Sequence, residues 1–397
     1  MAKKKKDEEE PKELVALTDA NFMDTLVEEL QQINPYASTM HNSQIYDIVD
    51  WIDLGLPALN MIVSSRFDRG IPAGRITQLY GESQSGKTLI ALTAAKNAQK
   101  KGYTVALMES EFGESKESMM NKGLDAHKTI VLPIKTLHSW YKCIRKIIEI
   151  KQRKPDEKIM IVTDSIGNIG STYETEKLEA EKKDQGHRQS TIRSIFKDIT
   201  IDIGVNAIPF IFTNHTYENP RDLFKSREKN MSGGGGVKFM PTITVQFDLG
   251  SVIKEGIDKK AEIIGRVLKP YTVKNRVVPP YMSTEIELYF QTGFKKYSGL
   301  LQTALKFDLL SMEGGKVYVP HLPKIKRTKS GKKIEDHPVF KVSDALDGEI
   351  GDSIWVPILD KLQDLCIESN SYFSPEIEEI VEKEIKETPG IEVDAEE

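Results

Sequence analysis

A glycine-rich segment of eight residues constrains this chain more than any other feature. It runs from Gly81 to Thr88, reads GESQSGKT and matches the pattern G-x-x-x-x-G-K-[ST]. The apolar residues Ile76–Tyr80 before it predict a strand, and Lys87–Lys100, rich in alanine and leucine, predict a helix. The glycines let backbone N–H groups face phosphate oxygens, and the helix adds its positive dipole end. The segment therefore predicts a nucleoside triphosphate site within an α/β fold.

Each position of this segment has an expected task. Lys87 is expected to reach the β and γ phosphates, and Thr88 is expected to bind Mg²⁺ through its hydroxyl group. A glycine-rich turn without a ligand is the alternative, but it does not explain the strand and the helix on either side. We expect the phosphates to be held by the whole segment, which consists of Gly81, Glu82, Ser83, Gln84, Ser85, Gly86, Lys87 and Thr88.

Predicted strands and helices alternate after the glycine-rich segment. Such alternation is typical of a mostly parallel sheet with helices on both faces. After Gly236 the predicted strands follow one another without helices between them. The strands are expected at 104–108, 130–132, 158–163, 208–213, 242–249, 262–268 and 284–290, and the helices at 140–150, 189–203 and 300–310.

The composition changes along the 397 residues suggest four parts. Residues 1–54 are expected to form an N-terminal tail and an assembly helix at about 20–33, where Phe22, Leu26, Leu30 and Ile33 share one face. Residues 55–305 are expected to form the α/β core. A small C-terminal domain is expected at 306–374, and an acidic tail at 375–397.

Bulk properties exclude several classes of protein. The net charge of -5 gives no general argument for nucleic-acid binding, so such an argument must rest on local features. Two cysteines, Cys143 and Cys366, cannot form a disulfide framework, which fits a reducing cytosol. No apolar run approaches the ~18 residues of a membrane span. The charged start of the chain does not resemble a signal peptide, and we expect a cytoplasmic protein.

An acidic residue ends the predicted strand at 158–163. Asp164 directly follows this strand, so it is expected at the carboxyl edge of the parallel sheet. An acid at that edge can hold Mg²⁺, directly or through water. An ordinary helix-capping aspartate is the alternative.

Two further acids end the strand after the glycine-rich segment and its helix. Hydrolysis of a triphosphate needs a base that orients and deprotonates water near the γ phosphate. Glu111 is the preferred candidate and Glu109 the alternative. Two solvated acids at a strand end remain a further interpretation.

Together these motifs resemble ATPases of the RecA fold, and most closely the UvsX recombinases of large phages. The resemblance runs from about residue 55 to residue 305. It implies that Glu111 is the catalytic glutamate, which this fold places after the P-loop helix. The segments that carry it are ESEFG (109–113), DSIGN (164–168), YETE (173–176), NHTYE (214–218), the glycine run 233–236 and YSGLL (297–301).

The resemblance implies further site residues. His215 corresponds to the polar sensor of the γ phosphate, although a plain surface histidine is the alternative. Lys274 and Arg276 resemble a pair that caps ATP across the subunit interface, and Lys269 is another match for that pair. Tyr297 resembles an aromatic residue near adenine. Ser118 stands where a stacking tyrosine is common, so adenine recognition differs from the usual pattern.

Two loops of the family bind single-stranded DNA, and they correspond to residues near 169–188 and 216–236. Neither loop is strongly basic here. A long, polar loop with glycines at its end is nevertheless typical of a functional segment, because its backbone N–H groups can face phosphates and an aromatic ring can stack on a base. A surface loop without a ligand is the alternative. The candidate DNA-binding residues are Arg221, Phe224, Lys225, Arg227, Lys229, Gly233 and Gly234.

The resemblance implies a DNA-dependent ATPase that uses ATP and Mg²⁺. Such a protein assembles as a helical filament on single-stranded DNA, pairs it with homologous duplex DNA and exchanges strands. A loader protein and a single-strand-binding protein are the implied partners. A hexameric helicase with the same core and a non-hydrolysing P-loop assembly module are the alternatives.

Overall fold

The computed structural model describes residues 22–43, 45–170, 185–217, 229–232, 234–255, 262–314, 316–322, 325–329, 332–336 and 338–370. The chain divides into two compact units, residues 1–47 and 48–397. The smaller unit contains helix α1 (Phe22–Ile33) and the short helix η1 (Met40–Asn42). Helix α1 confirms the helix predicted at about 20–33. Its apolar side chains are exposed within this unit.

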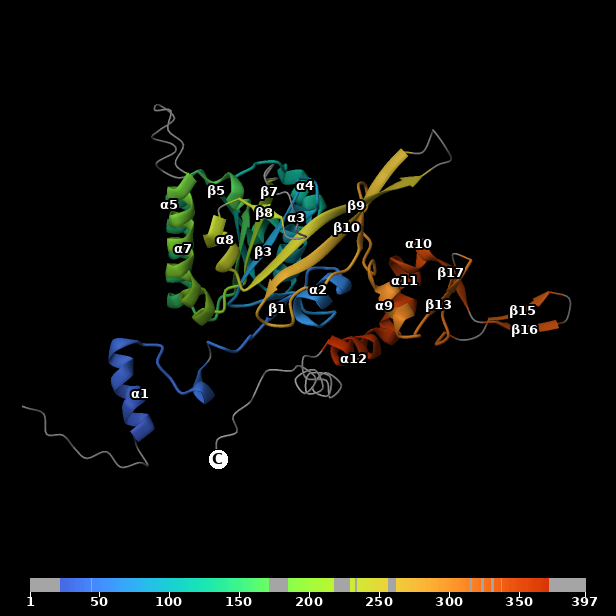
Figure 1. Ribbon diagram of the computed structural model, residues 1–397, viewed down its shortest axis with the longest axis horizontal. Helices are drawn as coiled ribbons and strands as arrows, with labels where there is room; N and C mark the ends of the chain where they lie inside the picture. Colours follow the sequence, from blue (N-terminus) through green and yellow to red (C-terminus); the bar gives the residue numbers. More distant parts are fainter. Residues whose placement is uncertain are drawn as a thin grey trace, which may run out of the picture. The chain divides into compact units, whose positions relative to one another are not determined.

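The larger unit is built on one mixed sheet, ten-stranded in the described part of the chain (Figure 1). The strands from β5 to β9 in the order β5-β4-β6-β7-β3-β9 are parallel, and β10, β11 and β12 continue the sheet as antiparallel strands. This architecture confirms the mostly parallel α/β core. The bounds are β3 (Ile76–Gly81), β4 (Thr104–Glu109), β5 (Thr129–Pro133), β6 (Ile159–Asp164), β7 (Phe210–Tyr217), β8 (Asn230–Met231, paired with β7), β9 (Ile243–Glu255), β10 (Glu262–Asn275), β11 (Ile286–Tyr289) and β12 (Gly293–Phe294).

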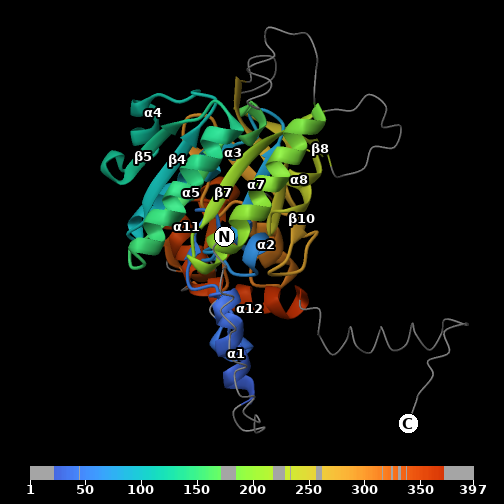
Figure 2. The same cartoon turned by 90° about the vertical axis from the view of Figure 1, so that its left-hand side faces the viewer.

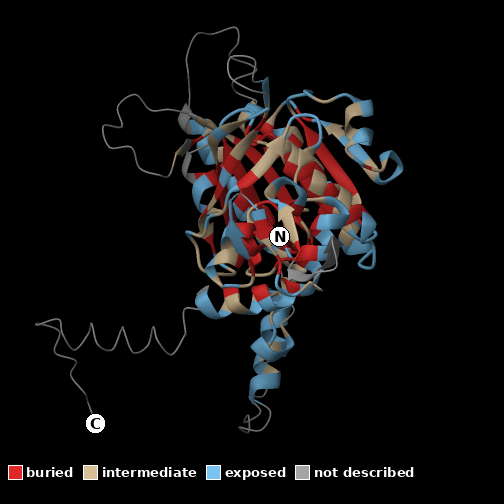
Figure 3. Ribbon diagram, turned by 90° about the vertical axis from the view of Figure 1, so that its right-hand side faces the viewer, coloured by how far each residue is buried: buried red, intermediate tan, exposed pale blue. Residues whose placement is uncertain are grey.

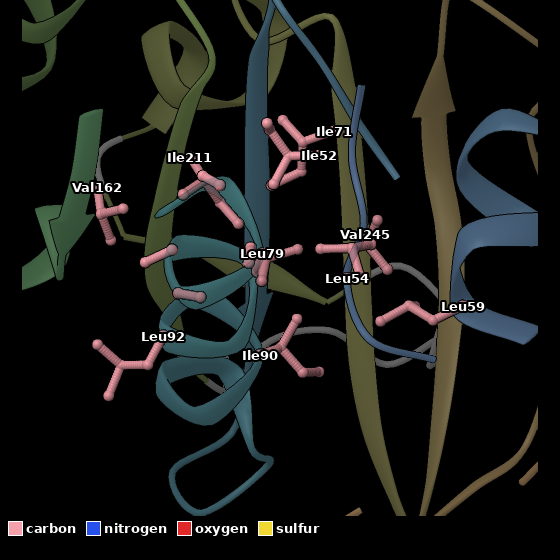
Figure 4. Close-up of a cluster of buried hydrophobic side chains, with 14 of the residues drawn as sticks. Ile52, Leu54, Leu59, Ile71, Leu79, Ile90, Leu92, Val162, Ile211 and Val245 are labelled. Carbon is pink, nitrogen blue, oxygen red and sulfur yellow. The ribbon is translucent and has the colours of Figure 1, made fainter. Parts of the chain in front are cut away.

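Helices cover both faces of the sheet because its strands are apolar on both sides. Leu79 packs with α2 (Pro57–Ser64) and α3 (Lys87–Lys100), and Figure 4 shows it gathered with Val245 and Ile90. The next residue, Tyr80, faces the other side and packs with α5 (Leu137–Arg153) and α7 (Gln185–Val205), the helices turned toward the viewer in Figure 2. Alternate residues of a strand point to opposite faces, so β3 contributes side chains to the apolar clusters on both faces of the sheet.

Residues after the sheet pack together with part of the core. Helix α9 (Leu300–Lys306), the sheet of β13, β14 and β17, and helices α11 and α12 enclose a third apolar cluster, which also takes in Ala58 and Met61 of α2. Figure 3 shows the buried residues inside these layers. The bounds are β13 (Ser311–Glu313), β14 (Lys316–Tyr318), β15 (Ile325–Lys329), β16 (Lys332–Asp336), β17 (Val339–Lys341), α10 (Val342–Ala345), α11 (Gly348–Trp355), η6 (Val356–Ile358) and α12 (Leu359–Asn370).

Several boundaries differ from the sequence predictions. Strands β9 and β10 are longer than expected because they pair with each other over most of their length. Helix α7 begins at Gln185, inside the first expected loop. Strand β1 (Trp51–Ile52) pairs with β2 (Ile71–Pro72) and so belongs to the larger unit, whereas the sequence predicts an N-terminal part that extends to residue 54. None of the helices in the described ranges has the length and apolar character of a membrane-spanning helix.

The remaining short helices are α4 (Lys116–Asn121), η2 (Ala126–Lys128), η3 (Ile166–Asn168) and α8 (Gly234–Phe239). Helix α8 contains three of the four glycines of the run 233–236. A Cβ atom on Gly236 would lie 2.8 Å from the backbone nitrogen of Arg193 in α7. That glycine therefore allows α8 to pack closely on α7. The sequence pattern alone did not predict this contact between the two helices.

Candidate functional site

The carboxyl ends of four parallel strands meet at one edge of the sheet. The register pairs Gly81 of β3 with His215 of β7, and Glu109 of β4 with Asp164 of β6. A pocket of about 480 Å³ opens at this edge. It is lined by Ser83, Gln84, Ser85, Gly86, Lys87, Thr88, Leu89, Glu111, Glu114, Asp164, His215, Leu288 and Phe290.

The glycine-rich segment forms the floor of this pocket. A Cβ atom on Gly81 would lie 2.4 Å from the carbonyl oxygen of Phe247, so no other residue fits there without a backbone shift. Gly86 has a φ of +75°, which favours glycine, and it directly precedes the 14-residue helix α3. The free N–H groups of the first turn of α3 and its dipole make this segment suited to a phosphate.

Lys87 lies at the centre of the segment. Its ammonium group donates to the carbonyl oxygens of Gly81 (3.1 Å) and Glu82 (2.6 Å) and lies 3.3 Å from the hydroxyl of Ser85. Burial lowers the pKa of Lys87, and the nearby carboxylates of Asp164 and Glu111 partly oppose this effect. A desolvated ammonium held by neutral carbonyls is well placed to attract an anion.

Asp164 and Thr88 face each other across the pocket. The Thr88 hydroxyl donates to one Asp164 oxygen at 2.8 Å, and the Thr213 hydroxyl donates to the other. Burial raises the pKa of Asp164, since the charged form loses hydration. A hydroxyl and a carboxylate beside a phosphate cradle are the oxygen ligands that Mg²⁺ prefers, and Mg²⁺ usually takes its other ligands from phosphate and water. Elsewhere in the described ranges, no cluster of acids, histidines and cysteines forms a preassembled metal site.

Two residues hold the Glu111 side chain, and a third acts through one of them. His215 Nε2 lies 2.6 Å from Glu111 Oε1, and the Ser165 hydroxyl donates to the same oxygen. Ser110 fixes Ser165 in turn, because its hydroxyl donates to the Ser165 carbonyl at 2.7 Å and accepts from the Ser165 N–H at 3.0 Å. The hydrogen bond from His215 lowers the pKa of Glu111, so this carboxyl group is ionised near neutral pH. No motif in the sequence pointed to the two serines.

Glu109 has a different environment from Glu111. Its side chain lines a separate, mostly apolar pocket of about 290 Å³ with Phe112, Met119 and Val131. Burial and the nearby charges of Asp164 and Glu111 raise the pKa of Glu109 to about 7. The structure therefore brings Glu111, and not its neighbour, to the glycine-rich segment.

Tyr297, expected near the base of the nucleotide, lies elsewhere. It is fully buried, its ring stacks on Trp355 at 6.0 Å, and its hydroxyl donates to Asp352 in the C-terminal region. Its place in this core leaves no face of the ring open to a ligand, so the structure contradicts that assignment. Phe290 and Leu288 line the pocket instead, and they come from the strand predicted at 284–290.

Lys274 and Arg276 lie far from the glycine-rich segment of their own chain. In the sheet, Lys274 of β10 pairs with Thr244 of β9, and Thr244 pairs with Gln78 of β3. Gly81 lies three residues beyond Gln78 along β3, so it is distant from Lys274 in both directions of the sheet. The Lys274 ammonium donates to the Phe239 carbonyl. Burial, with a smaller effect of Arg276, lowers the Lys274 pKa to about 8. Lys269 differs from both, because it forms an ion pair with Glu285 at 2.7 Å.

The expected DNA-binding residues lie mostly outside the described residues, as do most of the first loop and the acidic tail. Gly234 begins helix α8. Lys229 bridges the carboxylates of Glu82 (2.5 Å) and Asp248 (3.0 Å), so its charge is already neutralised within the chain. The expected contact of Lys229 with DNA stays a prediction. The candidates outside the described residues are Arg221, Phe224, Lys225, Arg227 and Gly233.

Comparisons with known proteins found a matching family model and several similar proteins. The family model described as the RecA N-terminal domain matches residues 37–295, more than half of the chain. The chain is 29% identical to the protein RecA of Ureaplasma parvum serovar 3 over 251 residues, which cover 63% of this chain and 71% of that protein. It is 28% identical to the recombination and repair protein of Enterobacteria phage T4 over 273 residues, covering 68% of this chain and 66% of the phage protein.

The buried carboxyl group of Glu109 leads to a prediction about stability and pH. Its folded-state pKa is raised, so the folded protein keeps the proton between about pH 4.5 and pH 7 while the unfolded chain has lost it. The free energy of unfolding of the wild type should therefore fall across this range, on the order of 2–3 kcal/mol. Glu109→Gln imitates the protonated acid, so it should be more stable than the wild type at pH 8 and similar to it near pH 4.5.

Denaturant unfolding at both pH values, without nucleotide, measures this difference. Glu111→Gln is the matched control with the opposite sign, because the pKa of Glu111 is lowered. Its loss of stability should be present at pH 8, should persist near pH 4.5, and should disappear only at lower pH, as the pH falls through the lowered pKa. Equal destabilisation by Glu109→Gln at the two pH values would contradict the buried, protonated state.

Proposed function

The chain belongs to the RecA family of recombination and repair proteins, and we propose that it is an ATP-dependent recombinase. It forms a filament on single-stranded DNA, pairs that strand with homologous duplex DNA and exchanges strands. The observation that carries this proposal is the shared pocket of the glycine-rich segment, Asp164 and the Glu111–His215 pair. His215 lies on β7, which leads directly into the second expected DNA loop.

The pocket supports hydrolysis of the triphosphate. The ionised carboxyl group of Glu111 accepts a proton from water, and the oxygen of that water forms a bond to the γ phosphorus. The bond from the γ phosphorus to the bridging oxygen breaks, and ADP leaves with its electron pair. Lys87 stabilises the charge on the β and γ phosphates, and Thr88 and Asp164 would hold magnesium. When bound, Mg²⁺ neutralises charge on the phosphate oxygens.

His215 suits the role of γ-phosphate sensor. Its ring contacts Glu111, while its backbone carbonyl accepts from the N–H of Ser232, at the far end of the second loop. The adjacent Asn214 side chain donates to the Ser232 carbonyl at 2.7 Å. A change at the γ phosphate can therefore alter the base of a DNA loop through a few hydrogen bonds. ATP then acts mainly as a switch between filament states.

Lys274 and Arg276 suit a role at the neighbouring subunit. Residues along a strand are about 3.3 Å apart and strands about 4.8 Å apart, so the register puts the Lys274 Cα roughly 14 Å from that of Gly81. Neither side chain can reach its own phosphates over this distance. Within the described part of the chain neither cation has a carboxylate partner, which leaves both charges available to an anion from another subunit.

The DNA and protein partners follow from the same proposal. Single-stranded DNA contacts the two loops near 169–188 and 216–236, and duplex DNA supplies the homologous strand. A loader protein and a single-strand-binding protein assist the assembly. The protein acts in the cytoplasm, which is the host cytoplasm if a phage encodes the chain. A non-hydrolysing assembly module would not need a base beside the phosphate cradle. A ring-shaped helicase remains the rival that the assembly state tests.

Glu111→Gln should abolish most ATP turnover while ATP binding persists. The substitution keeps the shape of the side chain and removes only the base, so kcat should fall on the order of a hundredfold or more. Steady-state phosphate release, with nucleotide affinity measured separately, gives the two quantities. Loss of turnover in Glu109→Gln with a fully active Glu111→Gln would reverse the assignment of the two acids.

A mixing experiment tests whether Lys274 and Arg276 act across the interface. The Lys274→Ala/Arg276→Ala protein should bind nucleotide as a monomer but lose DNA-stimulated turnover. When it is mixed with Lys87→Ala protein, some interfaces combine an intact glycine-rich segment with intact cations. Partial ATPase activity should therefore return in the mixture. Two inactive proteins that assemble together on DNA but regain no activity at any ratio would contradict action in trans, and Lys269 would be tested next.

A further inference from the structure

Lys229 connects three elements that lie far apart in the sequence. It directly precedes β8, whose two residues pair with Thr216 and Tyr217 at the end of β7 and so close the base of the second loop. Its ammonium group bridges Glu82 of the glycine-rich segment and Asp248 of β9. One side chain therefore ties the C-terminal end of this loop to the phosphate cradle.

The backbone of Lys229 is fixed as firmly as its side chain. Its N–H donates to Gln246 at 2.9 Å, and Gln246 is fully buried. Gln246 also accepts from the hydroxyl of Tyr80 at 2.7 Å and donates to both oxygens of Asp248. Burial alone would lower the Lys229 pKa, but hydrogen bonds to Glu82 and Asp248 outweigh it, so the pKa lies above its usual value and the group stays charged.

Two lysines hold the same residue of the cradle. Lys87 donates to the backbone carbonyl of Glu82 at 2.6 Å, and Lys229 pairs with the carboxylate of Glu82. A bound triphosphate competes for the ammonium of Lys87, because a phosphate oxygen is a stronger partner than a neutral carbonyl. Any resulting shift of Glu82 is passed to Lys229 through a charged contact.

We propose that Lys229 is a positioning residue, which couples triphosphate binding to single-stranded DNA binding by bridging Glu82 and Asp248. This inference rests on the proposed function. It adds a second connection between the two sites, through Glu82 and Asp248, to the hydrogen bonds that join His215 and Asn214 to Ser232. Lys229 acts through Glu82 and does not contact DNA phosphates.

The test compares single-stranded DNA affinity with and without a non-hydrolysable ATP analogue, over a series of salt concentrations. In Lys229→Met the enhancement by the analogue should fall about fivefold or more, a typical size for such coupling. By linkage, the enhancement of analogue affinity by DNA should fall by the same factor. Lys229→Arg keeps the charge and should retain most of the coupling.

Control variants separate this role from simpler ones. Lys296→Met breaks an exposed ion pair with Asp352 at 2.9 Å in the C-terminal region and should leave the coupling intact. Glu82→Gln should weaken the coupling as Lys229→Met does, and the double variant should be no worse than either single one, because the pair acts as a unit. Thermal unfolding shows whether each variant is folded.

The salt dependence separates positioning from direct DNA contact. If Lys229 positions the loop, the slope of log affinity against log salt without nucleotide should match the wild type. A phosphate contact would make the slope shallower by about 0.7 in Lys229→Met, and Glu82→Gln would then bind DNA more tightly. That pattern, or unchanged coupling in folded Lys229→Met, overturns the inference. A wild-type protein that binds no single-stranded DNA in either state overturns the proposed function as well.

Discussion

Three carboxyl groups and one ammonium group share the desolvated edge of the central sheet. The parallel register pairs Glu109 with Asp164, and the carboxylates of Asp164 and Glu111 act on the ammonium group of Lys87. Because like charges in a buried site cannot all ionise freely, their surroundings separate them. Hydrogen bonds keep Glu111 ionised, whereas burial favours the protonated form of Glu109. The roles that we propose for Glu111 as the base and Asp164 as a metal ligand depend on this constraint.

The sequence was most informative where local chemistry decides the structure. Gly81 leaves no room for a side chain and Gly86 has a φ of +75°, so the pattern GESQSGKT predicted the turn, while its use as a phosphate site stays a prediction. The apolar strands ending in Glu109 and Asp164 predicted the edge at which the acids meet. The long helices α3 and α5 followed from their local composition, which for α3 is rich in alanine and leucine. In each case the residues that determine the structure are neighbours in the sequence.

Contacts between distant residues were not predictable from the same patterns. Tyr297 matched a motif, but its partner Trp355 lies in a region that the motif does not cover, and their stacking places the ring in a core. Lys229 looked like a basic loop residue because its two carboxylate partners, Glu82 and Asp248, are distant in the sequence. Ser110 and Ser165 carry no signal of their own, since they act only by holding Glu111.

The central claim is that nucleotide binding and DNA binding meet in an assembly of many subunits, because the cations at 274 and 276 cannot reach the phosphates of their own chain. Electron microscopy of the full-length protein with single-stranded DNA and a non-hydrolysable ATP analogue tests this claim most directly. The account predicts continuous helical filaments along the DNA, with the site of each subunit closed by Lys274 and Arg276 of the next. Closed rings, or filaments whose interfaces leave these two residues in solvent, would contradict it.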